Sequence, residues 1–78
     1  MVDRPVQLQI NQSGAWRTAL RWNARDDVVS DRILDAADAL LRAVSEAGTH
    51  AKGRVATDDG LQVAILHWQS DTGWTRDR

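Results

Sequence analysis

In one stretch of this chain the apolar residues recur at helical spacing. In the segments on both sides of it, apolar residues alternate with polar ones instead. The helical stretch is "DDVVSDRILDAADALLRAVSEAG", in which Asp26 or Asp27 suits the N-cap and Gly48 follows the predicted C-terminus. The flanking segments are typical of strands, because a strand places alternate side chains on opposite faces. The predicted apolar stripe of the helix comprises Val29, Ile33, Ala36, Ala37, Leu40 and Val44, and Leu34 and Leu41 widen it on one flank.

The segment before the helix, "VQLQINQSGAWRTALRW", predicts a β-hairpin with a turn cluster at its centre. A three-residue loop at Gln12-Ser13-Gly14 places Asn11 opposite Ala15. Such loops end in a left-handed residue, and glycine adopts that conformation without steric cost. Gly14 is therefore expected to have a positive φ.

The segment after the helix, "GRVATDDGLQVAILHW", follows the same plan. A three-residue loop at Asp58-Asp59-Gly60 places Thr57 opposite Leu61 and gives Gly60 the left-handed position. Taken together, the two hairpins predict a helix-facing side made of Val6, Leu8, Ile10, Trp16, Leu20, Trp22, Leu61, Val63 and Ile65.

The order of these elements predicts an α+β fold of ββαββ type, a four-stranded antiparallel sheet with the helix packed on one face. Its 78 residues suffice for one domain, which we assign to residues 1–70. Residues 71–78 are expected to form a loosely held tail, in which Trp74 is interpreted equally well as a tail residue or as an anchor.

A single helix covers one side of a sheet, so the other side is expected to be uncovered. We favour contact with another protein, or with a second copy of the chain as a homodimer, over an ordinary solvated face. Single-stranded nucleic acid is less favoured, because sheet platforms for it usually carry two or more exposed aromatic side chains. The candidate residues of this sheet face are Arg17, Arg21, Arg54, Leu66 and Trp68.

The predicted outer side of the helix carries a strip of acidic residues with Arg42 among them. Such a strip can imitate phosphates or dock on a basic groove of another protein. The alternative is an ordinary solvated helix face, which an Asp38–Arg42 pair at i, i+4 would stabilise. The acidic strip comprises Asp27, Asp31, Asp35, Asp38 and Glu46.

Composition and motifs argue against most other classes of function. The net charge of −1 is not that of a polybasic nucleic-acid binder, and the absence of cysteine excludes disulfides and thiolate metal sites. His50 and His67 supply only part of a zinc site, and no serine has a nucleophile signature. We predict no enzyme, no catalytic residue, no metal and no cofactor. The start "MVDRPVQLQI" lacks a signal-peptide core and no run is long enough to span a membrane, so we expect a cytoplasmic protein.

The layout resembles that of the small phage-encoded anti-CRISPR inhibitors of bacterial defence. The similarity lies in the hairpins "NQSGAW" and "TDDGLQ" around the helix with its aspartates. The resemblance implies binding to a CRISPR effector, or another basic nucleoprotein, in the host cytoplasm, which blocks access of nucleic acid or nuclease. The sequence thus predicts a non-enzymatic inhibitor or adaptor that acts by surface occlusion. The alternative is a nucleic-acid-binding module that uses the Arg/Trp sheet face.

Overall fold

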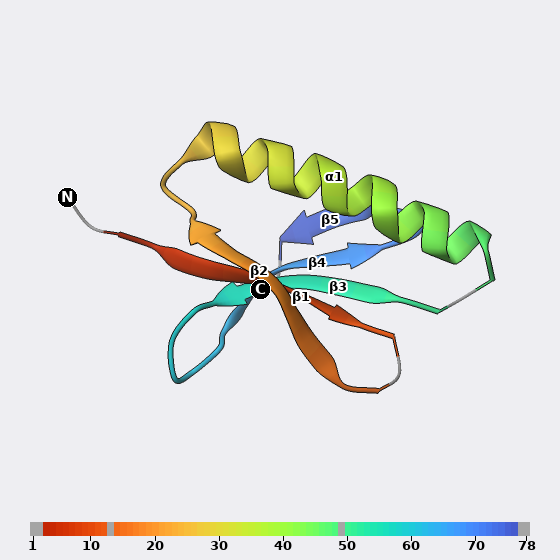
Figure 1. The fold of residues 1–78 in the computed structure, drawn as a ribbon, viewed down its shortest axis with the longest axis horizontal. Helices are drawn as coiled ribbons and strands as arrows, with labels where there is room; N and C mark the ends of the chain where they lie inside the picture. The colour runs from red at the N-terminus through yellow and green to blue at the C-terminus, as the bar shows by residue number, and fades with distance from the viewer. Residues whose placement is uncertain (1–2, 13, 49, 77–78) are drawn as a thin grey trace.

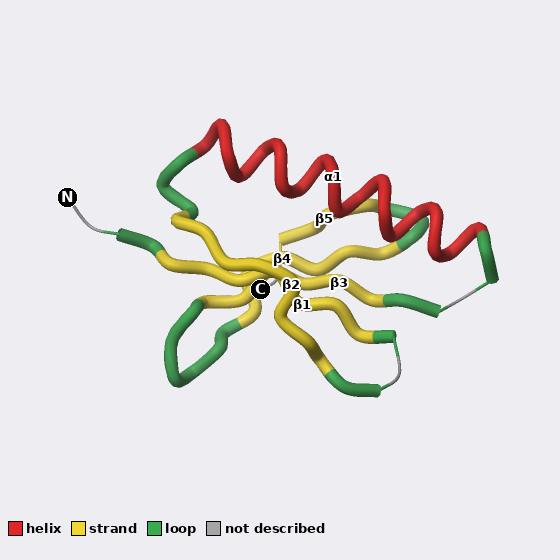
Figure 2. Tube along the Cα trace, in the orientation of Figure 1, coloured by secondary structure: helices red, strands yellow, loops and turns green. Residues whose placement is uncertain are grey.

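The chain folds as one antiparallel sheet with a helix lying across one of its faces (Figure 1). The computed structural model describes residues 3–12, 14–48 and 50–76. The α+β class is confirmed, but the sheet has five strands instead of four, in the order β2-β1-β3-β4-β5. Figure 2 shows the helix on one side of the strands. The elements are β1 (Pro5–Asn11), β2 (Trp16–Asn23), α1 (Asp27–Glu46), β3 (Lys52–Thr57), β4 (Ala64–Gln69) and β5 (Gly73–Arg76).

The additional strand, β5, comes from the segment that was assigned to the tail. Trp74 lies opposite Trp68 in the β4–β5 register. Its indole N–H donates a hydrogen bond to the carbonyl oxygen of Leu34 in α1, at 3.0 Å. This contact ties β5 to the helix, so Trp74 is an anchor. Residues 77 and 78 of the predicted tail lie outside the described residues.

The β1–β2 hairpin confirms the left-handed glycine but has a longer loop than predicted. Gly14 has a φ of 91°, and its N–H donates to the side-chain oxygen of Asn11 at 2.8 Å. Asn11 pairs with Trp16 and not with Ala15, so the predicted pairing is wrong. Ser13, part of the predicted loop, lies outside the described residues.

A β-bulge in this hairpin reverses the faces predicted for part of β2. Leu8 pairs with Leu20, whereas the next residue of β1, Gln9, pairs with Thr18. One extra residue in a strand flips every side chain beyond it to the other side. Trp16 therefore lies on the side away from α1, opposite to the prediction, and Arg17 lies on the helix side.

The β3–β4 loop also differs from the prediction, since it spans residues 58–63. The N–H of Thr57 donates to the carbonyl of Val63, at 2.9 Å. Gly60 does not have the predicted positive φ; Gln62 does, at 49°. The Asp59 carboxylate explains the wider turn, because its Oδ1 accepts the N–H groups of Leu61 and Gln62.

A second register shift reverses the predicted faces of Leu66 and Trp68 in the most apolar segment. The shift lies between Val55 and Ala56 of β3, which pair with Leu66 and Ala64 of β4. Leu66 and Trp68 thus lie on the helix side, and Trp68 is only 3% exposed. The residues predicted to face the helix are exposed instead: Leu61, Val63 and Ile65.

The helix begins as predicted but presents a different side to the sheet. Asp26 is the N-cap, and its carboxylate accepts the N–H of Val29. Leu41 is 1% exposed, whereas Leu40, placed in the predicted stripe, is 55% exposed, and Val29 is exposed as well. The buried side of α1 is therefore centred on Ala37 and Leu41, and the predicted stripe is corrected accordingly.

Three tryptophans explain this orientation, because each donates its indole N–H to α1. Trp22 donates to the Ser30 hydroxyl at 2.9 Å, Trp68 to the Asp38 carboxylate at 2.7 Å and Trp74 to the Leu34 carbonyl at 3.0 Å. A buried indole N–H needs such a partner, so these bonds fix which side of the helix meets the sheet. The core between α1 and the sheet comprises Val6, Leu8, Ala37, Leu41, Ala51, Val55 and Trp68.

Candidate functional site: the uncovered face of the sheet

The side of the sheet away from α1, here called the open face, is polar and partly basic. The strand registers assign its members, since residues that pair directly share a face. The main residues of the open face are Gln7, Gln9, Trp16, Thr18, Arg21, Lys52, Arg54, Ala56, Ala64, His67, Gln69 and Thr75.

The centre of the open face is a stack of Arg54 on Trp16. The guanidinium carbon of Arg54 lies 4.2 Å from the centroid of the Trp16 ring, which is a close cation–π contact. The Nε of Arg54 donates to the side-chain oxygen of Gln9, at 2.6 Å. The guanidinium is thus held by a ring and by a hydrogen bond, and within the described part of the chain its terminal nitrogens donate to no side chain or carbonyl.

Two buried glutamines support this stack from below. Gln7 is 2% exposed and Gln9 is 4% exposed, although no helix covers this side. Gln7 accepts the hydroxyl of Thr18 at 2.6 Å and donates to the carbonyl of Thr57 at 3.2 Å. Neighbouring side chains therefore cover the glutamines and satisfy them, which gives the open face an ordered floor.

The charges on the open face are mostly positive. Lys52 lies two residues before Arg54 on the same face of β3, and His67 pairs directly with Arg54 across β3 and β4. Arg21 lies at the margin, where its Nε is 3.4 Å from Asp58. The arrangement favours an anionic ligand around Arg54 and Lys52.

Of the five residues predicted for the sheet face, the structure brings two together. Arg21 and Arg54 lie on the open face, whereas Arg17, Leu66 and Trp68 lie on the helix side. The homodimer contact expected at Leu66 and Trp68 thus loses its structural basis. Sequence reasoning missed Trp16, Lys52 and His67 as members of this face. Lys52 could have been placed on this face from the sequence, because it lies two residues before Arg54 in a strand. The face of Trp16 could not, because it depends on the bulge.

The acidic strip divides into one structural carboxylate and four exposed ones. Asp38 accepts the indole N–H of Trp68 and the Nε of Arg42, and these two hydrogen bonds, the Trp68 bond first, hold the pKa of Asp38 below its ordinary value. Asp38 thus helps to fix the helix on the sheet. The exposed members, on the helix and away from the open face, are Asp27, Asp31, Asp35 and Glu46.

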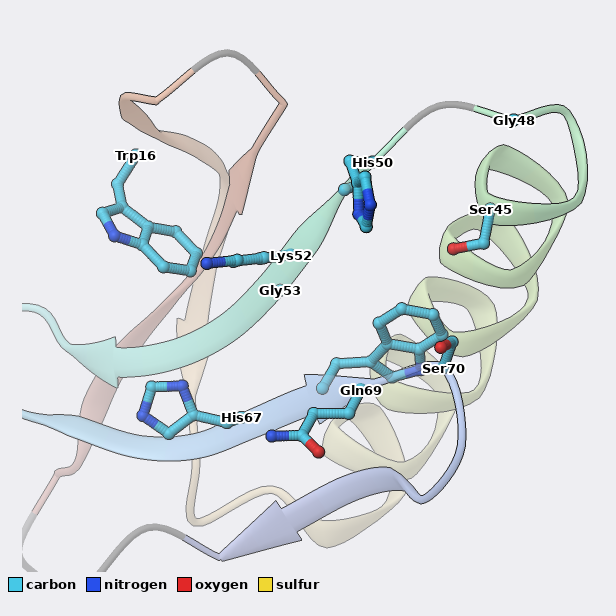
Figure 3. Close-up of a pocket in the computed structure, with 11 residues that line it drawn as sticks. Trp16, Ser45, Gly48, His50, Lys52, Gly53, His67, Gln69 and Ser70 are labelled. Carbon is cyan, nitrogen blue, oxygen red and sulfur yellow. The ribbon is translucent and has the colours of Figure 1, made fainter.

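The surface also has a pocket of about 650 Å³ beside the C-terminal end of α1 (Figure 3).

Within residues 3–12, 14–48 and 50–76, no group of three or more His, Asp or Glu side chains is arranged to hold a metal ion. The described part of the chain also contains no helix of the length and apolarity that crossing a membrane requires.

Comparison with known proteins gives no family. Family models, curated proteins and solved structures offer no match to this chain. Its function must therefore be argued from the site itself.

Proposed function

We propose that this chain is a non-enzymatic binding protein that holds single-stranded nucleic acid on its open face. The observation that carries the proposal is the position of Trp16. The chain has four tryptophans, and the other three are bonded to α1. Trp16 makes no such bond among the described residues; it lies on the open face, stacked on Arg54 and close to Lys52 along the strands.

An aromatic ring on a basic sheet suits an unpaired strand more than a duplex. Stacking of a base on an aromatic side chain contributes about 1–3 kcal/mol and tolerates any base. A duplex keeps its bases stacked inside, so it offers Trp16 no free base. Arg54 and Lys52 are placed to contact the phosphates on either side of a base that stacks on Trp16.

The division of charge between the two sides of the molecule supports this orientation. The net charge is only −1, but four exposed acids of the acidic strip lie on α1, whereas Arg54 and Lys52 lie with Trp16 on the other side of the sheet. Two or three phosphate contacts to a single strand predict a salt slope of about −1.5 to −2 in log K against log salt concentration. We therefore expect weak, salt-sensitive binding.

The test is the fluorescence anisotropy of a labelled oligothymidylate titrated with the protein. We expect Trp16→Ala and Arg54→Gln each to lower the association constant by about 5- to 150-fold, the loss of one stacking or charged contact. Arg32→Gln is the matched control, since it removes the same charge from the exposed side of α1. Circular dichroism should be unchanged in all three variants.

Two results would contradict the proposal. One is the absence of binding to the oligonucleotide at low salt. The other is an equal loss of affinity in Arg32→Gln and Arg54→Gln, because binding would then depend on overall charge and not on the open face.

A second candidate function, the protein-binding inhibitor or adaptor, is favoured by the β3–β4 loop. Leu61 is 82% exposed, and Val63 and Ile65 are exposed beside it. In Figure 1 this loop projects on the side of the sheet away from α1. An ordered loop that holds aliphatic side chains in solvent is typical of a contact site for another protein.

Hydrogen bonds around Asp59 keep this loop ordered. Its carboxylate accepts the N–H groups of Gln62 and Leu61 and the hydroxyl of Thr57. These bonds, the Gln62 bond first and the Thr57 bond second, hold the pKa of Asp59 below its ordinary value. Because the loop is ordered in advance, a partner would lose little conformational entropy in fixing Leu61.

The double variant Leu61→Ser with Val63→Ser tests this second function. We expect it to lose whichever protein the wild type captures, with a CRISPR effector as the first bait to try. Its stability should change by less than about 0.5 kcal/mol, since both side chains are exposed. Val28→Ser, an equally exposed aliphatic on α1, is the control. Capture that persists in the double variant would assign the loop to ordinary surface, and oligonucleotide affinity should be the same in both variants.

A further inference from the structure

The pocket beside the C-terminal end of α1 borders the open face. Its lining comes from the end of α1, the start of β3 and the end of β4, with Trp16 on its far side (Figure 3). The volume of about 650 Å³ lies within the range of roughly 300–1,000 Å³ that small-molecule sites have. Trp16, Lys52 and His67 belong both to this lining and to the open face, so a strand that crosses the face can end in the pocket.

The side chains of the pocket suit a phosphate group. The basic residues are His50, Lys52 and His67, and the described residues that line the pocket include no carboxylate. Ser45 and Ser70 add hydroxyl groups, and Figure 3 shows Lys52 extending in the direction of Trp16. The primary amine therefore lies beside the aromatic wall, and the hydroxyl groups lie on the opposite side of the pocket, near α1.

The C-terminal end of α1 disfavours the binding of an anion, because the helix carbonyls there carry partial negative charge. Two of these carbonyls already accept hydrogen bonds: Ala47 N–H donates to Ala43 at 3.1 Å, and Gly48 N–H donates to Ser45 at 3.0 Å. The helix end is thus partly neutralised, and Lys52 supplies a full positive charge on the other side of the pocket.

We propose that this pocket binds a nucleoside monophosphate group, with the base against Trp16 and the phosphate on Lys52. The group has two sources, a free mononucleotide or the phosphorylated end of a strand. For the second source the inference rests on the proposed function, and it then assigns to the protein a preference for phosphorylated ends.

The experiment compares four probes: oligothymidylate with a terminal hydroxyl, the same strand with a 5′-phosphate or a 3′-phosphate, and thymidine monophosphate. For the wild type we expect one of the phosphorylated ends to raise the association constant by about tenfold. Ser45→Leu, which fills the pocket from α1, should remove that gain and leave the affinity for the hydroxyl strand unchanged. His50→Gln serves as a second variant. His50 is exposed and lines the pocket, and its replacement leaves the open face intact. Arg32→Gln is again the control.

The outcomes separate this inference from the proposed function. Equal affinity for the hydroxyl and phosphorylated strands, with no binding of thymidine monophosphate, overturns the pocket and leaves the open face standing. Binding of the mononucleotide but not of any strand supports the pocket and contradicts the proposed function. Inorganic phosphate that competes as well as thymidine monophosphate also overturns the inference, because the pocket would then hold an anion only.

Discussion

Replacing Leu41 with alanine is expected to lower the free energy of unfolding by about 3–5 kcal/mol, which is the upper part of the range for a buried leucine. Leu41 is 1% exposed and packs with Trp68 and Ala51 between α1 and the sheet. Gly53 lies directly beneath it: a Cβ built there would be 2.7 Å from Leu41 Cδ1. Such close packing leaves little room for relaxation, so truncation leaves a cavity. Urea unfolding followed by circular dichroism measures the loss.

Leu40→Ala is the matched control, because it removes the same atoms one position away on the same helix. Leu40 is 55% exposed, and its truncation should change the stability by less than about 0.5 kcal/mol. The sequence pattern predicts the reverse order, since it places Leu40 in the buried stripe and Leu41 on the flank. A larger loss for Leu40→Ala would therefore show that α1 packs with the side that the pattern favours.

Trp68→Glu is expected to unfold the protein. The residue is 3% exposed, and its indole N–H donates to Asp38 at 2.7 Å. A carboxylate there would be buried and would face another carboxylate, a change that costs more than about 4 kcal/mol. A domain of 78 residues has a stability of only about 4–12 kcal/mol. Circular dichroism and the loss of a cooperative thermal transition measure the effect.

Trp68→Phe gives a milder version of the same test. It keeps most of the ring packing but removes the donor to Asp38, so we expect a loss of about 1–3 kcal/mol with the fold retained. Had Trp68 been on the uncovered face, as the alternation predicted, Trp68→Glu would give a folded protein with a changed surface. A folded Trp68→Glu variant would thus contradict the register of β4.

The features that the sequence predicted correctly are those that local interactions decide. The helix follows from the spacing of apolar residues, and its N-cap at Asp26 follows from a side chain that reaches the first free N–H groups. The left-handed Gly14 follows from turn chemistry within a few residues. Arg21 and Arg54 could be placed on the uncovered face because the two register shifts do not change their side of the sheet.

The features that it did not predict depend on how distant segments pair. Which face Trp16 takes is decided by one extra residue in β2, and which face Leu66 and Trp68 take is decided by the register shift beside Ala56. A shift of one residue moves every side chain that follows to the opposite face of the sheet. The alternation of apolar and polar residues is compatible with either assignment of faces. Trp16, the centre of the candidate site, was therefore assigned to the core, and Trp68, a core residue, to the surface.

The sequence by itself determined the α+β class, the position of the helix and four of the strand-forming segments, because helical periodicity, capping and alternation are properties of neighbouring residues. The tertiary structure alone decided the side of α1 that is buried, the fifth strand and the composition of the open face. The physical reason is the hydrogen-bonding need of three indole N–H groups, which find their acceptors on α1 only after the sheet has formed. Those bonds draw Trp22, Trp68 and Trp74 to the helix side, and the bulge in β2 leaves Trp16 with Arg54 on the other.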